Sequence, residues 1–81
     1  MTNKEHLEKA LQYVRDNHRW SDAEEQVAID NINHYRRDIS VASDKIACEI
    51  VDLINEYGRE NDLPDNWWWE FANVDDIFFK L

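Results

Sequence analysis

The stretch DAEEQVAIDNINHYRRDISVASDKIACEIVDLINEYG, residues 22–58, decides the fold. Its apolar residues recur every three or four positions, with a mean step of about 3.6, which is the period of an α-helix. The stripe consists of Ala28, Ile32, Tyr35, Ile39, Ala42, Ile46, Ile50, Leu53 and Tyr57. Because its phase never slips, the pattern predicts one long helix at about residues 22–57. Gly58 follows at the position where helices often end.

The same stretch carries a signal for a break near residues 40–43. Ser43 can cap a new helix, because a serine oxygen accepts a free backbone N–H at a helix start. Asp44 then suits the first turn, where the helix dipole favours an acid. The sequence leaves the continuous and the broken helix both open.

A continuous helix has a consequence for assembly. One chain of this size cannot cover the whole stripe, so a homodimer or larger oligomer is expected. Ile32, Tyr35 and Ile39 are then the predicted oligomer seam.

The residues before this stretch predict another helix. Thr2 and Glu5 have the spacing of a capping box, and the apolar residues after them repeat at helical spacing. We therefore expect a helix at about residues 3–18. Ser21 and Glu24 repeat the capping-box spacing where the central stretch begins.

The tail, residues 63–81, is rich in aromatic side chains. Pro64 fits the first turn of a short helix and Asn73 fits the cap of another. A hairpin pairing residues 67–71 with 77–81 is the alternative, since aromatic residues also favour strands. One glycine and one proline in 81 residues leave few turns for a β fold. The prediction is an all-α single domain over residues 1–81.

The charge of the chain restricts its partners. Nine basic and eighteen acidic side chains give a net charge of −9. This field repels nucleic acid and anionic membranes and attracts basic protein surfaces. The expected partner is therefore a protein with a basic surface, without direct binding to nucleic acid or membrane. The N-terminal residues have no apolar signal region, and one cysteine fits a reducing compartment, so a cytoplasmic location is expected.

Four acids share one side of the central helix and form a candidate partner-binding face. Glu49, Asp52, Glu56 and Glu60 are spaced by three, four and four residues. Steps of four advance about 6 Å along a helix, which resembles the charge spacing along a nucleic-acid backbone. The face could occupy a protein groove that binds phosphates, or it could be an ordinary solvated face.

Trp67, Trp68 and Trp69 form a candidate aromatic edge. Three consecutive side chains cannot all face one core, whether the segment is a helix or a strand. At least one ring is expected at the surface, where tryptophan is common in binding hot spots. The alternative is a lid that closes a small core.

The residues with catalytic chemistry form no recognisable site. His6, His18 and His34 lack the short spacings of metal motifs. Cys48 lies in an apolar stretch and is expected to be a small buried residue. The sequence therefore predicts a non-catalytic protein with no metal and no cofactor.

Small size, strong acidity and surface aromatics are similar in kind to small inhibitor proteins, such as phage inhibitors of host defence. The resemblance is one of composition. It implies an inhibitor or adaptor that docks on a basic, nucleic-acid-handling protein. The alternative is a helical homo-oligomer or accessory subunit with no inhibitory role.

Overall fold

The computed structural model describes residues 2–35, 39–70 and 72–81. Its helices are α1 (Asn3–Asn17), α2 (Asp22–Tyr35), α3 (Ile39–Ala42), α4 (Asp44–Glu60) and α5 (Val74–Lys80). The described residues contain no strand, which confirms the all-α prediction and makes the hairpin alternative wrong.

Thr2 and Ser21 cap the starts of α1 and α2, as their spacing predicted. The Thr2 hydroxyl accepts from the backbone N–H of Glu5 at 3.2 Å. At α2 the contacts are reciprocal: Glu24 N donates to Ser21 Oγ at 3.1 Å, and Ser21 N donates to Glu24 Oε1 at 3.4 Å. The helix predicted at 3–18 is confirmed, with His18 as its C-cap.

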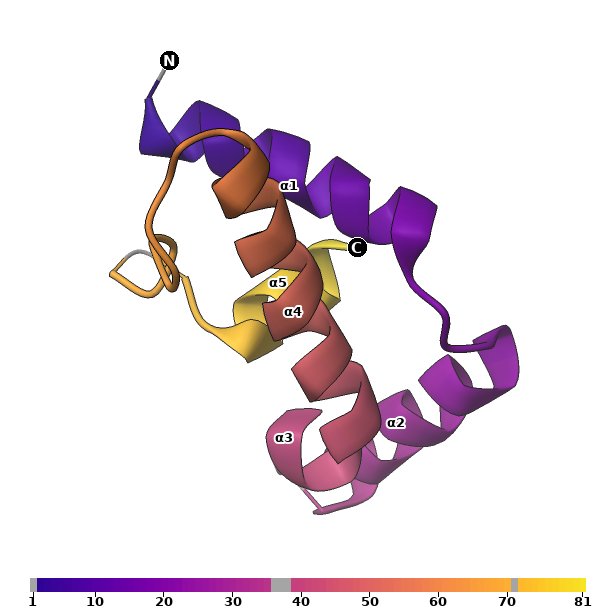
Figure 1. Cartoon of the computed structure of the whole chain (residues 1–81). Helices are drawn as coiled ribbons and strands as arrows, with labels where there is room; N and C mark the ends of the chain where they lie inside the picture. Colours follow the sequence, from indigo (N-terminus) through magenta and orange to yellow (C-terminus); the bar gives the residue numbers. More distant parts are fainter. Residues whose placement is uncertain (1, 36–38, 71) are drawn as a thin grey trace.

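α2 ends at Tyr35, and α3 and α4 are separated at Ser43, so the prediction of one continuous helix is wrong and the alternative of a broken helix is confirmed. The Ser43 backbone is extended (φ −155°, ψ 94°), and its hydroxyl accepts from Ile46 N at 3.3 Å. An extended residue ends helical hydrogen bonding and caps the next helix. α2 and α4 run in different directions, and α3 lies between them in the chain (Figure 1).

The break changes what covers the apolar stripe. Ile39 is completely buried within the chain, and Ile32 is half-buried against the same core. The side chain of Tyr35 lies outside the described residues. The premise of the predicted seam, a stripe too long for one chain to cover, therefore fails, because the folded-back chain covers Ile39 itself.

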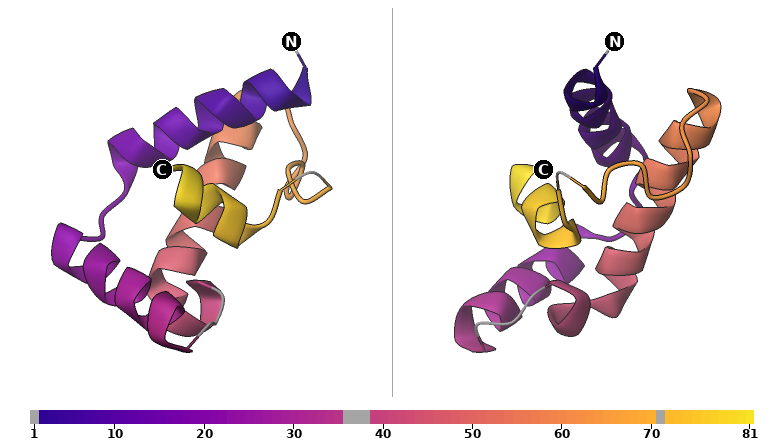
Figure 2. Two further views of the ribbon diagram at one scale, coloured as in Figure 1. Left: turned by 180° about the vertical axis from the view of Figure 1, so that it is seen from behind. Right: turned by 90° about the vertical axis from the view of Figure 1, so that its left-hand side faces the viewer.

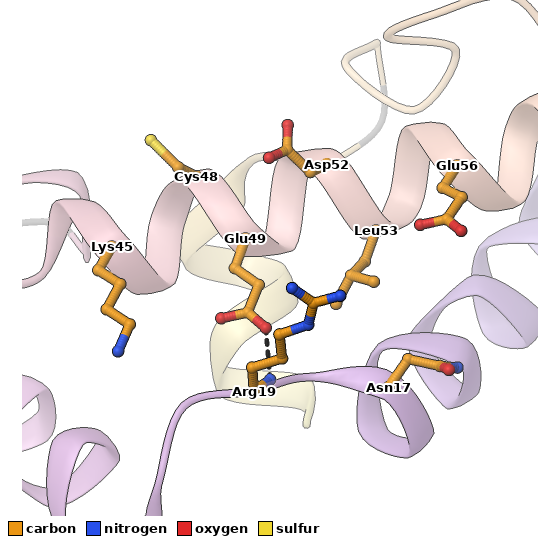
Figure 3. Close-up of a pocket in the computed structure, with 8 residues that line it drawn as sticks. All are labelled: Asn17, Arg19, Lys45, Cys48, Glu49, Asp52, Leu53 and Glu56. Atoms are coloured by element: carbon orange, nitrogen blue, oxygen red, sulfur yellow. Dashed lines mark hydrogen bonds between the residues drawn. The ribbon is translucent and has the colours of Figure 1, made fainter.

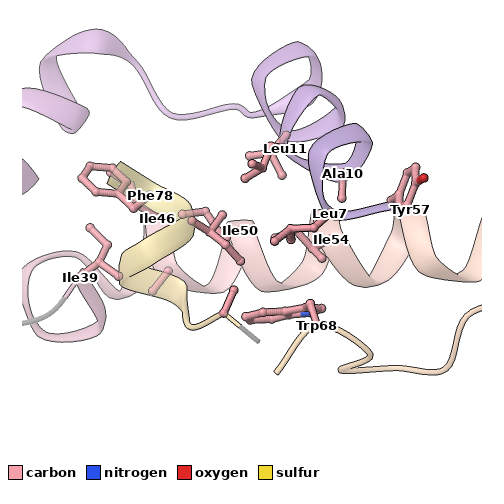
Figure 4. Packing of buried hydrophobic residues seen from close by; sticks show 14 of the residues in the cluster. Leu7, Ala10, Leu11, Ile39, Ile46, Ile50, Ile54, Tyr57, Trp68 and Phe78 are labelled. Carbon is pink, nitrogen blue, oxygen red and sulfur yellow. The ribbon is translucent and has the colours of Figure 1, made fainter. Parts of the chain in front are cut away.

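α4 is the centre of the molecule. α1 crosses one side of it, while α5 and the preceding loop pack on another (Figures 1 and 2). Leu7, Leu11 and Phe78 meet the α4 isoleucines in one continuous core (Figure 4). Among the described residues, the largest completely buried side chains are Trp68, Ile39, Ile46, Ile50, Ile54, Ile77 and Val14.

α4 ends three residues later than the predicted end at residue 57. The helix runs to Glu60, and Asp62 takes the left-handed conformation (φ 59°) that Gly58 was expected to take. Leu63 N then donates to Gly58 O at 2.8 Å, which is the closing bond of a Schellman motif. Gly58 serves another purpose, since a Cβ there would lie 2.6 Å from Nε1 of Trp67.

The loop before α5 is fixed to α4 by Asn55. Its Oδ1 accepts from Asn66 N at 2.9 Å and from Trp68 Nε1 at 3.1 Å, and its Nδ2 donates to Asn66 Oδ1 at 3.2 Å. Asn66 is left-handed (φ 62°), which interrupts any helix that begins at Pro64. Residues 65–70 accordingly form turns, and the helix expected at Pro64 is absent.

α5 begins at the predicted cap, Asn73, which forms a capping box with Asp76. Two contacts hold the helix in place. Asp75 Oδ1 accepts from Ile39 N at 2.6 Å, and Arg15 donates to the backbone oxygen of Lys80 at 2.5 Å. α5 is thereby fixed between α3 and the end of α1.

Candidate protein-binding surface

Three of the four acids predicted to form a face are exposed on α4. Asp52, Glu56 and Glu60 are exposed, whereas Glu49 is half-buried. All four acids lie on α4, and Glu49 differs from the other three in its exposure.

Glu49 has a structural contact. Its Oε1 accepts from the backbone N–H of Arg19, in the connection between α1 and α2. Figure 3 shows Glu49 extending toward this connection, while Cys48 and Asp52 point away from it. Glu49 fastens the connection to α4, so its carboxylate is only partly available to a partner.

Glu56 contacts α1 through Tyr13. Burial of the tyrosine, its hydrogen bond to Glu56, and the negative charges of Glu56 and Glu60 together raise the pKa of Tyr13 to about 12. The phenol is thus a neutral hydrogen-bond donor over the physiological pH range. It supports Glu56 without neutralising its charge.

The cations on α4 do not neutralise the exposed acids. Lys45 Nζ pairs with Glu24 of α2 at 2.7 Å, and Arg59 Nε pairs with Asp65 in the loop at 3.2 Å. Glu24 raises the pKa of Lys45, and Lys45 lowers the pKa of Glu24. Each cation is therefore matched by a carboxylate outside α4, and the charge of the helix surface stays negative.

A hollow of about 550 Å³ lies between α4 and the end of α1 (Figure 3). Its lining is Asn17, Arg19, Lys45, Cys48, Glu49, Asp52, Leu53 and Glu56. The lining mixes both signs of charge with few apolar groups. Such a lining offers little to a small apolar ligand, whose sites are mostly apolar.

Cys48 is exposed, so the prediction of a buried cysteine is wrong. The apolar side of α4 passes through Ala47 and Ile50, and the cysteine falls on the opposite side. Its Sγ lies 3.7 Å from Oδ1 of Asp44. The charge of Asp44, partial burial, this hydrogen bond and the charge of Asp52 raise the pKa of the thiol. A raised pKa leaves less of the nucleophilic thiolate at neutral pH.

His6 and His18 contact aromatic residues of the fold, and His34 is exposed in the last turn of α2. His6 Nδ1 lies 2.9 Å from the hydroxyl of Tyr57, and the His18 ring stacks on Trp20 at 4.1 Å between centroids. Among the described residues, no three His, Cys, Asp or Glu side chains converge as metal ligands would.

The three consecutive tryptophans have two different environments. Trp67 and Trp68 are 7% and 0% exposed and belong to the core, whereas Trp69 is 61% exposed. The prediction that at least one ring reaches the surface is confirmed. The predicted aromatic edge is reduced to Trp69, because the Asn55 contact turns Trp68 inward and Trp67 fills the space above Gly58.

Trp69 borders a groove between α4 and α5 that the sequence did not reveal. Two hollows of about 210 and 320 Å³ share Val51 and Val74 and so adjoin each other. The lining of this α4–α5 groove is Asp44, Ala47, Cys48, Val51, Asp52, Trp68, Trp69, Ala72, Asn73 and Val74. Val51 is an apolar residue of α4 beside the predicted stripe, and this was the signal available in the sequence. Only the position of α5 shows that Val51 lines a groove.

Comparison of the chain with protein-family models, curated proteins and solved structures finds no match. None of the helices in the described ranges is both long enough and apolar enough to cross a membrane.

Proposed function

We propose that this chain is a non-catalytic binding protein that docks on a basic protein surface through the exposed side of α4. The observation that supports this most directly is the charge arrangement. Asp52, Glu56 and Glu60 are exposed on one helix, and the two cations of that helix are paired elsewhere. An unmatched row of carboxylates attracts a cationic surface and repels an anionic one.

The position of Trp69 gives this docking an apolar component. Asp52 lines the same groove as Val51, and Val51 lines the hollow that Trp69 borders. Charge speeds and orients an encounter, while a large aromatic side chain contributes affinity at the contact. The acidic row and Trp69 therefore belong to one continuous candidate surface.

A basic partner surface that binds nucleic acid is the target that such a row fits best. Successive acids on α4 advance about 6 Å along the helix axis. A protein site built for phosphates would accept them in place of nucleic acid. The expected consequence of binding is inhibition of the partner by exclusion of its nucleic acid.

The test is capture of partners from the native host with the parent protein and a charge-reversed variant, Asp52→Lys/Glu56→Lys. Both side chains are exposed and neither forms a salt bridge with a described residue; the variant loses the hydrogen bond from Tyr13 to Glu56, a cost of about 1–3 kcal/mol, so its folding is measured directly. Opposite charges become like charges at the interface, so we expect capture of the partner to be lost.

The matched control is Glu8→Lys/Asp30→Lys, which changes the net charge equally at exposed positions of α1 and α2. Circular dichroism checks that all three proteins are folded. Equal capture by the parent and the α4 variant would contradict the proposal. If the control variant loses capture equally, net charge alone is responsible and the α4 surface is not the binding site. Nucleic acid added as a competitor should release the partner.

A further inference from the structure

The α4–α5 groove combines an apolar floor with an acidic rim. Trp68 and Ala72 are buried and form part of the floor, and Val51 and Val74 are half-buried. Asp44 and Asp52 are exposed along the α4 side.

Among the described residues that line the groove there is no cation, and the charged side chains are those two aspartates. A ligand that fills this groove must place apolar atoms on the floor and is attracted there if it carries positive charge.

We infer that the α4–α5 groove binds a cationic amphipathic segment of the partner protein. The inference rests on the proposed function and names the part of the partner that makes contact. An apolar side chain of the segment lies between Val51, Val74 and Trp69, and flanking lysine or arginine side chains approach Asp44 and Asp52.

The geometry of α4 sets the spacing of the two basic side chains expected in the partner segment. Asp44 and Asp52 are eight residues apart on α4, or about 12 Å along its axis. A helical segment lying alongside α4 therefore carries its cations two turns apart, at positions i and i+7 or i+8. Its apolar anchor lies between them on the same face, since residues three or four apart are neighbours on a helix.

The charge of the chain decides against other occupants. A second copy carries the same net charge of −9, and the cations of its α4 are already paired with Glu24 and Asp65. Nucleic acid and anionic lipid are repelled by the aspartates of the rim. A cationic segment is the occupant that both the floor and the rim favour.

The test uses a displayed library of random peptides selected on the whole protein, followed by fluorescence anisotropy titration of labelled synthetic binders. We expect selected peptides to carry two basic residues flanking an aliphatic or aromatic one. Trp69→Ala should weaken their binding about 30-fold, the equivalent of a hot-spot side chain. Asp52→Lys should weaken it about tenfold or more and should reduce its dependence on salt.

Phe79→Ala is the matched control for the tryptophan. Phe79 is 61% exposed, the same fraction as Trp69, but it does not line the groove. This variant should bind the peptides as the parent does. The inference is wrong if the library yields no binders, if the binders are neutral or acidic, or if Trp69→Ala binds them with parental affinity.

Partner capture separates the failure of this inference from failure of the proposed function. One outcome is that partner capture requires Asp52 and Glu56 but is unchanged in Trp69→Ala. The proposed function then stands, and the groove is not part of the binding site. A second outcome is that peptide binding depends on Trp69 while partner capture survives the charge reversal. In that case the groove is a binding site, but the docking of α4 on a basic surface is wrong. A dimer that dissociates in Trp69→Ala without any change in peptide affinity would identify a second copy as the occupant.

Discussion

At the scale of the residue, a glycine is required at position 58 because Trp67 packs against it, and not because the helix ends there. It is the only glycine of the chain, and it lies inside α4 with a conformation that other residues can adopt. The indole of Trp67 occupies the space in which a side chain would stand, and its Nε1 donates to Ile54 O at 3.4 Å. From sequence alone, a glycine near a helix end indicates a cap. The role of Gly58 could not be predicted, because the approach of Trp67 is a tertiary contact.

Gly58→Ala should destabilise the protein by up to about 2 kcal/mol. Alanine gains about 1 kcal/mol in helix propensity, but overpacking a core typically costs 1–3 kcal/mol. The buried Trp67 has little room to retreat from a contact of 2.6 Å. Urea denaturation followed by circular dichroism measures the change. In a Trp67→Leu background the same substitution should be neutral or stabilising, and a loss of similar size there would contradict the explanation.

At the scale of the element, the helices of this chain were largely predictable because their caps are local. Thr2, Ser21 and Asn73 accept from backbone groups three residues ahead, so the short-range pattern contains the whole interaction. The turns at residues 65–70 were not predictable, because Asn66 is held by Asn55 from another element. The α4–α5 groove escaped prediction for the same reason, since its walls come from distant segments.

Ser43 marks the boundary between α3 and α4. Its cap competes with an apolar period that continues in phase through residues 22–57. Because periodicity reports only which residues share a face, it cannot show that the axis has turned. The separate α3 packs against α5, where Ile39 N donates to Asp75 Oδ1, and that long-range contact is invisible in a local pattern.

Ser43→Ala should lower the free energy of unfolding by about 1 kcal/mol. The substitution removes the acceptor for Ile46 N at the start of α4, and loss of an N-cap typically costs this amount. Ser43→Asp is the control, since aspartate caps as well as serine, and it should remain close to the parent. Thermal and urea unfolding give the comparison. Equal stability of the alanine and aspartate variants would show that packing alone fixes the break.

At the scale of the whole molecule, α1 and α4 are joined by a contact that depends on pH. Tyr13 of α1 is hydrogen-bonded to Glu56 of α4, and its pKa rises from 10.0 to about 12. Burial also raises the pKa of Tyr57. A pKa that is higher in the folded state favours folding fully below the unfolded pKa, and this contribution is lost as the pH rises toward the folded pKa.

We therefore expect the free energy of unfolding to fall between about pH 10 and pH 12. Tyr13→Phe should show a shallower fall, because one of the responsible phenols is removed. Urea denaturation at a series of alkaline pH values measures both slopes, and ultraviolet absorbance follows phenol ionisation directly. Identical slopes in the two proteins would exclude Tyr13 as a source of the alkaline loss.

The unequal exposure of the tryptophans gives the unmodified protein its own optical reporter. Of the four indoles, Trp20, Trp67 and Trp68 are at most 7% exposed, whereas Trp69 is 61% exposed. A water-soluble collisional quencher such as acrylamide therefore reaches one emitter in preference to the other three. That emitter stands at the edge of the α4–α5 groove. When a ligand without tryptophan binds in the groove, it should shield Trp69 and reduce the fraction of the emission that acrylamide quenches. Binding could then be followed without attaching a dye.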